Sequence, residues 1–285
     1  MQKKLYDKKQ LNKLIVVHKP MFRSSNSYLN EIKRKYRNKK AGFSGTLDPF
    51  ACGCLIVAFG QYSKLFQFLK KTPKTYRAVI WLGAQSESLD IENIIDIEDE
   101  KKVDIKKLKN EIDKLVGTHH YYPPKFSAKK IDGKRAYDLA REGKEDIQMK
   151  KTSMEVYNTK FISYRHPFIT FEASVSEGSY IRSLAQILLS RLQLKGTLSY
   201  LNRLNEGVFK FENEKDLDPL DFLDLKENIY LGDKSYFQDG KKIEKRYFES
   251  QENGKYIIKF DDFFSIIQIE NDEVKYLLNK VLLSD

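Results

Sequence analysis

The chain has 285 residues, a formal net charge of +11, and 41% apolar and 13% aromatic residues. This length and composition are typical of a water-soluble globular protein with one sizeable core and a small second domain. No apolar run approaches the roughly 20 residues of a membrane-spanning helix, and the lysine-rich start lacks a secretory signal, so we expect a cytoplasmic protein without a membrane partner. Two cysteines, Cys52 and Cys54, are too few for a disulfide framework or a zinc site.

The positive charge is concentrated at the N-terminal end of the chain. Residues 1–40 hold thirteen Lys or Arg and two acids, Asp7 and Glu31, so they account for the whole excess of +11. A basic segment of this kind is the electrostatic footprint of a protein that binds the phosphate backbone of a nucleic acid. A solvated surface is the alternative interpretation.

The first part of the chain alternates between strand and helix patterns. An apolar run predicts a buried strand over 14–17, and Ser24 offers an N-cap for a helix whose apolar residues recur at helical spacing as far as Tyr36. Further apolar patterns predict a strand over 55–59, a helix over 63–71 and a strand over 75–83, with Tyr76 near the start of the last.

One carboxylate, Asp48, lies in a stretch of small and turn-forming residues, 42–53. Three glycines and a proline among these twelve residues predict tight turns, and the small side chains leave room for close approach. Because an apolar strand follows directly, we expect Asp48 to be held in place. An Asp-Pro turn that caps a strand is the alternative.

The middle of the chain differs sharply in charge from segment to segment. Residues 86–100 hold seven acids and no Lys or Arg, so we expect this loop to lie away from any RNA-binding surface. Residues 105–115 predict an amphipathic helix, and the adjacent His119 and His120 are interpreted as structural because no metal-ligand spacing accompanies them. Residues 123–151, with nine basic residues and five acids, are typical of an RNA-binding loop, with a short helix around 136–142.

Two functional candidates lie at a predicted junction between a strand and a helix. Alternation predicts a half-buried strand over 169–175, and a helix follows the turn at 177–179, so Tyr180 and Arg182 lie where the helix begins. A surface aromatic residue and a solvated arginine are the alternative. Residues 214–227 look like a linker, and the short apolar runs after residue 230 predict a small β-rich domain docked on the first.

Several of these stretches together resemble the TruB family of tRNA pseudouridine synthases, over about residues 14–210. The motifs that carry the likeness, in chain order, are Lys19-Pro20 with Ser24-Ser25, Gly45-Thr46-Leu47-Asp48-Pro49, Gly60 to Lys64, Lys74-Thr75-Tyr76-Arg77, Pro123 to Gly133, Gly178 to Ser183, and Tyr200 to Leu204. The resemblance implies an α+β fold with a mixed, largely antiparallel central sheet flanked by helices and loops. It further implies a catalytic domain over 1–228 and a small β-rich, PUA-like RNA-binding domain over 229–285.

The resemblance also implies the reaction and the roles of the site residues. A monomeric enzyme without cofactor or obligate protein partner would flip uridine 55 out of the T-loop of tRNA and isomerise it to pseudouridine. Asp48 would attack the sugar carbon or uracil C6, or remove a sugar proton, and Arg182 would keep it ionised. Tyr76 would stack on the uracil and assist proton removal from C5, Tyr180 would donate a hydrogen bond, and Leu201 would form an apolar floor.

The resemblance implies RNA contacts from Lys19, Phe43 and Lys64, and two residues depart from the family pattern. Phe43 replaces the usual histidine, which leaves stacking but removes hydrogen bonding, and Phe22 replaces a glycine in the turn after Pro20. Phe43 and the basic N-terminal segment therefore motivate a second hypothesis, a tRNA-binding folding chaperone in which catalysis is lost or incidental. A pseudouridine synthase that acts on another RNA is a third.

Overall fold

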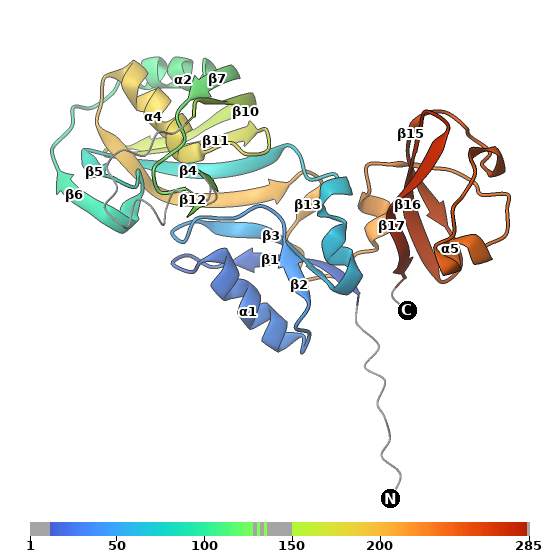
Figure 1. The fold of residues 1–285 in the computed structure, drawn as a ribbon. Coiled ribbons are helices and arrows are strands. Elements are labelled where there is room, and N and C mark those ends of the chain that lie inside the picture. Colours follow the sequence, from blue (N-terminus) through green and yellow to red (C-terminus); the bar gives the residue numbers. More distant parts are fainter. Residues whose placement is uncertain (1–11, 128–129, 132–133, 136–149, 284–285) are drawn as a thin grey trace, which may run out of the picture.

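The computed structural model describes residues 12–127, 130–131, 134–135 and 150–283. The expected helix around 136–142 and much of the expected RNA-binding loop over 123–151 lie outside the described residues. Within the described ranges, no helix is long and apolar enough to cross a membrane. Figure 1 shows the fold as a large strand-rich body with a smaller strand-rich body at its C-terminal end.

The larger body is built on a nine-stranded sheet with the order β1-β3-β12-β4-β11-β10-β7, to which β2 and β13 add at β3 and β12. Its strands are β1 (Lys13–Lys19), β2 (Ala41–Phe43), β3 (Cys52–Phe59), β4 (Lys74–Leu82), β7 (Gly117–Tyr121), β10 (Thr152–Arg165), β11 (Phe168–Val175), β12 (Gly196–Glu206) and β13 (Phe209–Lys210). Only the pair β3 and β12 is parallel among the described strands of this sheet. The predicted mixed, largely antiparallel α+β architecture is therefore confirmed.

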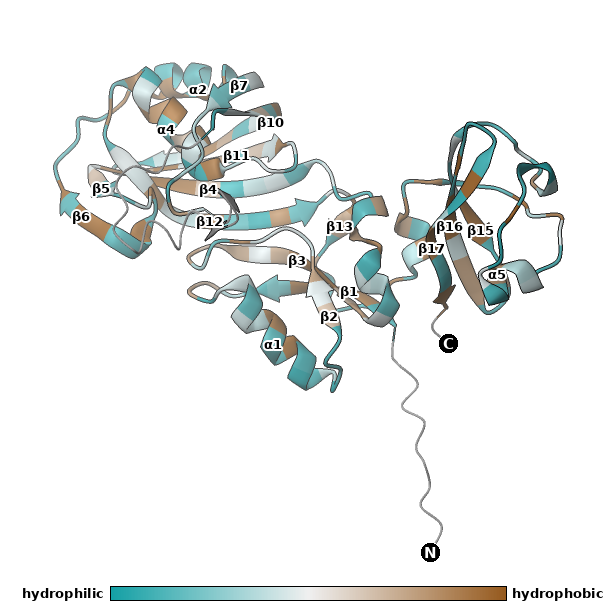
Figure 2. Ribbon diagram, in the orientation of Figure 1, coloured by the Kyte–Doolittle hydropathy of each residue, from teal (hydrophilic) through white to brown (hydrophobic). Residues whose placement is uncertain are grey.

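Helices and short strand pairs surround this sheet. They are α1 (Ser25–Lys35), α2 (Ile105–Asp113) and α4 (Ile181–Leu192), with the pairs β5 (Ala84–Ser86) and β6 (Ile94–Ile97), and β8 (Lys130–Ile131) and β9 (Lys134–Arg135). Helix α4 packs against β12 and β4, and α2 packs against β10 and α4, around a core that includes Leu184, Leu188 and Phe171. Figure 2 shows hydrophobic residues along the strands of both bodies, whereas α1 is largely hydrophilic.

Local sequence signals set where α1 begins. The Ser24 hydroxyl accepts a hydrogen bond from Ser27 N–H at 3.1 Å, which satisfies one of the free donors of the first turn. The first strand and this helix agree with the prediction, as do β3, β4, α2, β11 and α4.

The predicted helix over 63–71 is wrong. This segment forms two 3₁₀ turns, Gly60–Lys64 and Phe66–Phe68, instead of an α-helix. The backbone groups that would continue a helix bond elsewhere: Lys70 N–H donates to the Phe222 carbonyl at 2.9 Å, and Asp224 N–H donates to the Phe68 carbonyl at 2.7 Å. The apolar spacing thus reflects burial against a distant segment, which periodicity alone does not distinguish from a helix.

The C-terminal body is a four-stranded sheet with the order β14-β15-β16-β17 and one short helix. Its elements are β14 (Lys226–Glu227), α5 (Ser235–Asp239), β15 (Gly254–Lys259), β16 (Phe263–Glu270) and β17 (Glu273–Leu282). Strand β14 joins this sheet from within the expected linker, which otherwise forms a 3₁₀ turn at Pro219–Phe222. The expected β-rich C-terminal region is confirmed, and its sheet already begins at residue 226.

The two bodies share a hydrophobic core and polar contacts. Leu14 and Ile56 of the larger sheet belong to the same buried cluster as Ile257 and Phe264 of the smaller one. The Gln61 side chain accepts a hydrogen bond from Leu282 N–H at 2.9 Å and donates to the Lys280 carbonyl at 3.0 Å. These contacts dock the smaller sheet firmly on the larger body.

Phe22 tests how the turn after Pro20 tolerates a bulky residue. Its φ is +58°, in the left-handed region, and its side chain is 66% exposed. Because an L-residue with a Cβ is strained there by roughly 1–2 kcal/mol, we expect Phe22→Gly to be more stable than Phe22→Ala by about 1 kcal/mol. Both variants lose the exposed ring, and only glycine relieves the backbone strain. The difference between their free energies of unfolding in urea therefore measures the strain alone. Equal midpoints would contradict this explanation.

Candidate active site

Asp48 lies on a loop between β2 and β3 that is fixed by its own backbone and by α1. The Ser25 hydroxyl accepts a hydrogen bond from Leu47 N–H at 3.0 Å and donates to the Leu47 carbonyl at 2.9 Å. Ala51 N–H donates to the Asp48 carbonyl at 3.1 Å and closes a turn around the carboxylate. The N–H and the carbonyl of Leu47, directly before Asp48, are thus both hydrogen-bonded to Ser25. This confirms the expectation that Asp48 is held in place.

Asp48 faces a cavity of about 470 Å³. Its side chain is 31% exposed. Of the residues that the sequence singled out, Tyr76 from β4, Tyr180 from the start of α4 and Leu201 from β12 line the same cavity. The fold therefore brings four segments that are far apart in sequence to one hollow.

Arg182 approaches Asp48 from behind the cavity wall and is almost completely buried, at 2% exposure. Its Nη2 lies 3.0 Å from Asp48 Oδ2 and donates to the Phe126 carbonyl at 2.8 Å. Its Nη1 donates to the Ser88 carbonyl at 2.7 Å and to Asp90 Oδ2 at 3.3 Å. A buried guanidinium needs such acceptors, because desolvation of an unpaired charge is costly.

Asp90 is the site residue that sequence reasoning missed. The acidic loop 86–100 is expected to lie away from an RNA-binding surface, which stays a prediction, but its Asp90 is 1% exposed beneath Arg182 and so supports the site from inside the protein. Burial raises the pKa of Asp90, while the Ser88 hydroxyl, which donates to Oδ1 at 2.6 Å, and the Arg182 charge lower it. No local spacing signals this pair, because Asp90 and Arg182 are 92 residues apart.

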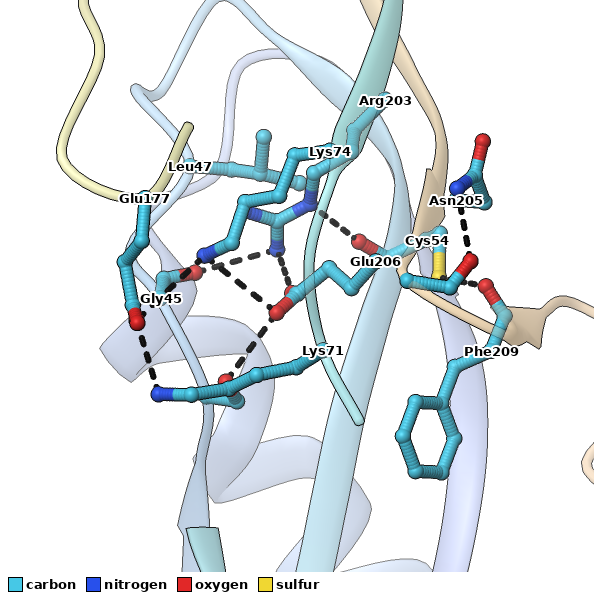
Figure 3. A network of polar contacts seen from close by, with 12 residues as sticks. Gly45, Leu47, Cys54, Lys71, Lys74, Glu177, Arg203, Asn205, Glu206 and Phe209 are labelled. Atoms are coloured by element: carbon cyan, nitrogen blue, oxygen red, sulfur yellow. Dashed lines mark hydrogen bonds and ion pairs between the residues drawn. The ribbon is translucent and has the colours of Figure 1, made fainter. Parts of the chain in front are cut away.

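A second buried cluster holds the opposite end of the Asp48 loop (Figure 3). Glu206 of β12 is fully buried, and its carboxylate accepts from the Ser44 hydroxyl at 3.0 Å. It pairs with Arg203 Nη2 at 2.5 Å and with Lys74 Nζ at 3.4 Å. Arg203 Nη2 also donates to the Gly45 carbonyl at 3.0 Å. We call Ser44, Lys74, Arg203 and Glu206 the Glu206 cluster.

A β-bulge makes the Glu206 cluster possible. Arg203 and Glu206 are three residues apart, which in a regular strand would place them on opposite faces. The register of β12 against β4 shifts between Arg203 and Asn205, so Arg203 lies opposite Tyr76 and Glu206 lies opposite Lys74. Both charged residues therefore face the same side as Tyr76.

Burial sets the protonation state of the two tyrosines at the cavity. It raises the pKa of Tyr76, with the neighbouring Arg203 charge acting in the opposite direction. It also raises the pKa of Tyr180, which a hydrogen bond with Ser127 partly offsets. Both side chains are therefore neutral phenols at pH 7, able to stack and to donate a hydrogen bond, and Tyr76 is poorly suited to accept a proton.

Comparison with known proteins places this site in a family. Residues 33–181 match the model of the TruB family pseudouridylate synthase (N terminal domain). Sequence relatives include the tRNA pseudouridine synthase B of Sulfurovum sp. (strain NBC37-1), 54% identical over 95% of this chain and 98% of that protein. The chain belongs to the TruB family. The tRNA pseudouridine synthase B of Campylobacter concisus (strain 13826) is 51% identical over 95% of this chain and 99% of that protein.

Solved structures show the same fold at much lower identity. A chain in the crystal structure of a Cbf5-Nop10-Gar1 complex matches with a TM-score of 0.65 at 18% identity, covering 96% of this chain and 85% of that one. A chain in an archaeal box H/ACA sRNP Nop10-Cbf5 complex matches with a TM-score of 0.63. These structures show the fold, whereas the family model and the sequence relatives confirm the TruB family, and with it an isomerase, as the sequence motifs predicted.

The three expected RNA contacts of this TruB protein lie outside the cavity lining. Lys19 is fully buried, and its Nζ donates to the carbonyls of Pro20 at 2.9 Å, Arg23 at 2.6 Å and Pro49 at 3.2 Å. This amine therefore points at backbone and ties the turn after Pro20 to the Asp48 loop, which Figure 1 shows beside it. Phe43 is half-buried at the end of β2, and Lys64 is exposed.

The histidines and acidic side chains of the described residues form no candidate metal site. The described ranges contain no group of three or more His, Cys, Asp or Glu residues that could hold a metal ion. His119 lies on β7, and its Nε2 hydrogen-bonds with the Leu115 carbonyl at 2.7 Å, a structural contact as the sequence indicated.

Asp90→Asn tests whether the second carboxylate matters for the reaction. The asparagine amide has the size of the Asp90 carboxylate and keeps one hydrogen-bond acceptor, but it removes the negative charge beneath Arg182. The guanidinium is then attracted only by Asp48 and is expected to shift. We expect the rate of pseudouridine formation to fall about tenfold or more, because small displacements in a site are costly. Glu87→Gln, the same change at an exposed position of the same loop, should stay within about twofold. Equal rates for both variants would contradict the role of Asp90.

Lys19 predicts a pH dependence of stability. Burial lowers its pKa from 10.5 to about 8 in the folded protein. Between these values the unfolded chain binds more protons at this residue than the folded chain, so its contribution to stability increases as the pH rises. The free energy of unfolding of the parent protein minus that of Lys19→Met should therefore rise between pH 8 and 10. A flat or falling difference in urea unfolding would contradict a lowered pKa.

Proposed function

We propose that this TruB protein isomerises uridine 55 in the T-loop of tRNA to pseudouridine, with Asp48 as the catalytic carboxylate. The observation that carries the proposal is the Asp48 carboxylate, bound at 3.0 Å by a buried arginine and open to a cavity with two neutral tyrosines. The names of the sequence relatives, tRNA pseudouridine synthase B, support tRNA as the substrate.

The reaction needs no redox change and no second substrate. The bond between uracil N1 and C1′ of the sugar breaks, the base rotates, and a bond from C5 to C1′ forms, while C5 loses a proton and N1 gains one. Asp48 starts this sequence by attacking C1′ or C6, or by removing a sugar proton. Each route requires a carboxylate held in a fixed position, and the Arg182 guanidinium binds that of Asp48 at 3.0 Å.

The cavity residues take complementary roles around the extruded base. Tyr76 stacks on the uracil, Leu201 provides the apolar floor, and the Tyr180 phenol donates a hydrogen bond. The volume of about 470 Å³ lies within the range of ligand pockets and accommodates a nucleotide base. Because Tyr76 is neutral, we assign it stacking and give proton removal from C5 to another base or to water.

Binding contacts offset the few kcal/mol that unstacking a base costs. The last turn of α1 carries Lys33, Arg34 and Lys35, and Lys64 is exposed at the end of its 3₁₀ turn. With Phe43 and the segment 123–151, these residues form our proposed T-arm surface. We assign residues 229–285, together with β14, to a PUA-like RNA-binding domain, and we propose that the enzyme acts as a cytoplasmic monomer without cofactor or obligate protein partner.

Tritium release from tRNA transcript labelled at uracil C5 tests the reaction. The parent protein should release the label from one T-loop uridine, and Asp48→Asn should lower the rate by at least about a thousandfold while it still binds tRNA. Turnover by Asp48→Asn would refute the catalytic assignment of this residue. A parent protein that binds and refolds tRNA without releasing tritium would instead favour the chaperone hypothesis, and release from ribosomal RNA fragments alone would favour another substrate.

A further inference from the structure

Lys74 is a buried cation whose ammonium group lines the active-site cavity. The residue is 5% exposed, and its nearest carboxylate oxygens are Glu206 Oε2 at 3.4 Å and Glu177 Oε1 at 3.9 Å (Figure 3). A charge-assisted hydrogen bond between nitrogen and oxygen is about 2.7–2.9 Å long. Lys74 is thus attracted by two carboxylates without a close bond to either, so donor capacity remains for a ligand.

Gly45 of the Asp48 loop lines the cavity beside Lys74. It lies over Lys74 Nζ, and a Cβ at position 45 would come within 2.5 Å of that nitrogen. The glycine also has a φ of +57°, which a side chain would strain. Glycine is therefore favoured here by its backbone conformation, and its missing side chain leaves room beside Lys74 Nζ.

The charges around Lys74 favour an anion. Glu177, on the turn before α4, lies 2.7 Å from Lys71 Nζ and also approaches Lys74. Together with the Arg203 and Glu206 pair, this cluster beside the cavity holds three basic groups and two carboxylates, a formal net charge of +1. Burial also lowers the pKa of Lys74, because the charged form is poorly solvated. An anionic ligand beside this amine would stabilise the charged form again.

We propose that Lys74 binds a phosphate oxygen of the RNA, in a linkage next to the extruded uridine, and that Glu177 competes with this phosphate for Lys71 and Lys74. The inference rests on the proposed function, because the cavity must receive a nucleotide. RNA supplies a phosphate on both sides of every base, whereas uracil itself carries no charge. Lys74 is thus a substrate-binding residue on the wall that also carries Arg203.

The experiment compares RNA hairpins of the T-arm in which a single linkage beside the target uridine is a neutral methylphosphonate. Dissociation constants are measured in an Asp48→Asn background, so that no turnover occurs. The unmodified hairpin should bind about tenfold more weakly to Lys74→Met than to the protein with Lys74, because one charge-assisted contact is lost. Lys74→Arg should retain most of the affinity. Lys74→Met should fold, since Glu206 keeps Arg203 and Ser44 as partners.

The proposal is decided by whether the effects of Lys74→Met and of the methylphosphonate linkage on affinity are coupled. One methylphosphonate linkage should weaken binding to the Lys74 protein about tenfold and leave the binding of Lys74→Met unchanged, since the contact is already absent. If every linkage costs Lys74→Met as much as it costs the parent, Lys74 contacts no phosphate and the proposal is wrong. A loss of affinity on Lys74→Met that no linkage reproduces would point to a uracil oxygen instead and would equally refute it.

Glu177→Gln supplies an independent test with a matched control. Removal of this carboxylate frees both lysines, so affinity for the hairpin should increase by about threefold or more. Glu98→Gln makes the same change of charge in the exposed pair with Lys195, which lies at 2.7 Å, and should have a smaller effect. Equal gains would show a general charge effect and would contradict competition at Lys74.

The two proposals fail in distinguishable ways. A parent protein that forms no pseudouridine refutes the proposed function, whatever the hairpin measurements give. Normal pseudouridine formation with additive effects of Lys74→Met and every methylphosphonate refutes only the phosphate contact.

Discussion

The contact on which the site depends is the buried guanidinium of Arg182. An arginine that is only 2% exposed is tolerated in a folded protein only if hydrogen-bond acceptors surround its guanidinium. Here those acceptors come from the Asp48 loop, from residues 88–90 and from Phe126. Three segments that share no local structure are thereby fixed to one end of α4. The same interaction orients Asp48 at the cavity, so the contacts that fix these segments also position the candidate catalytic carboxylate.

Two charged clusters of opposite net charge lie beside the cavity. Around Arg182, one cation faces two carboxylates, Asp48 and Asp90, whereas around Lys74 the cations outnumber the carboxylates by one. In a region of low dielectric such charges act strongly on whatever enters. A nucleotide has a matching asymmetry, because its base is neutral and its phosphate is anionic. The arrangement therefore favours one orientation, with the sugar and base toward Asp48 and a phosphate toward Lys74.

The sequence predicted the elements that carry the site better than the contacts that complete it. The predicted strands and the N-cap at Ser24 depend on local patterns, and the glycine-rich stretch around Asp48 marked the loop correctly because tight turns require particular residues. Lys19 illustrates the limit: the family resemblance implied a contact with RNA, whereas its amine donates to three backbone carbonyls. Asp90 is a second case, since its loop is acidic on average and Asp90 is the only one of its seven acids that is buried. Such pairings depend on tertiary contacts, and no local spacing records them.

The irregular part of the sheet explains why these residues converge. Strands β3 and β12 run parallel for only two residue pairs, Asn202 with Cys52 and Arg203 with Gly53. A Cβ at Gly53 would lie 2.3 Å from the Arg203 carbonyl, so only glycine lets the two backbones approach at this point. Directly beyond it, the bulge in β12 turns Glu206 toward Ser44 and Lys74. A regular sheet would have placed Glu206 on the opposite face, and the Asp48 loop would then lack its second anchor. The site thus lies where the hydrogen-bond register of the sheet shifts. Gly53 allows the two backbones to approach there, and the bulge in β12 produces the shift.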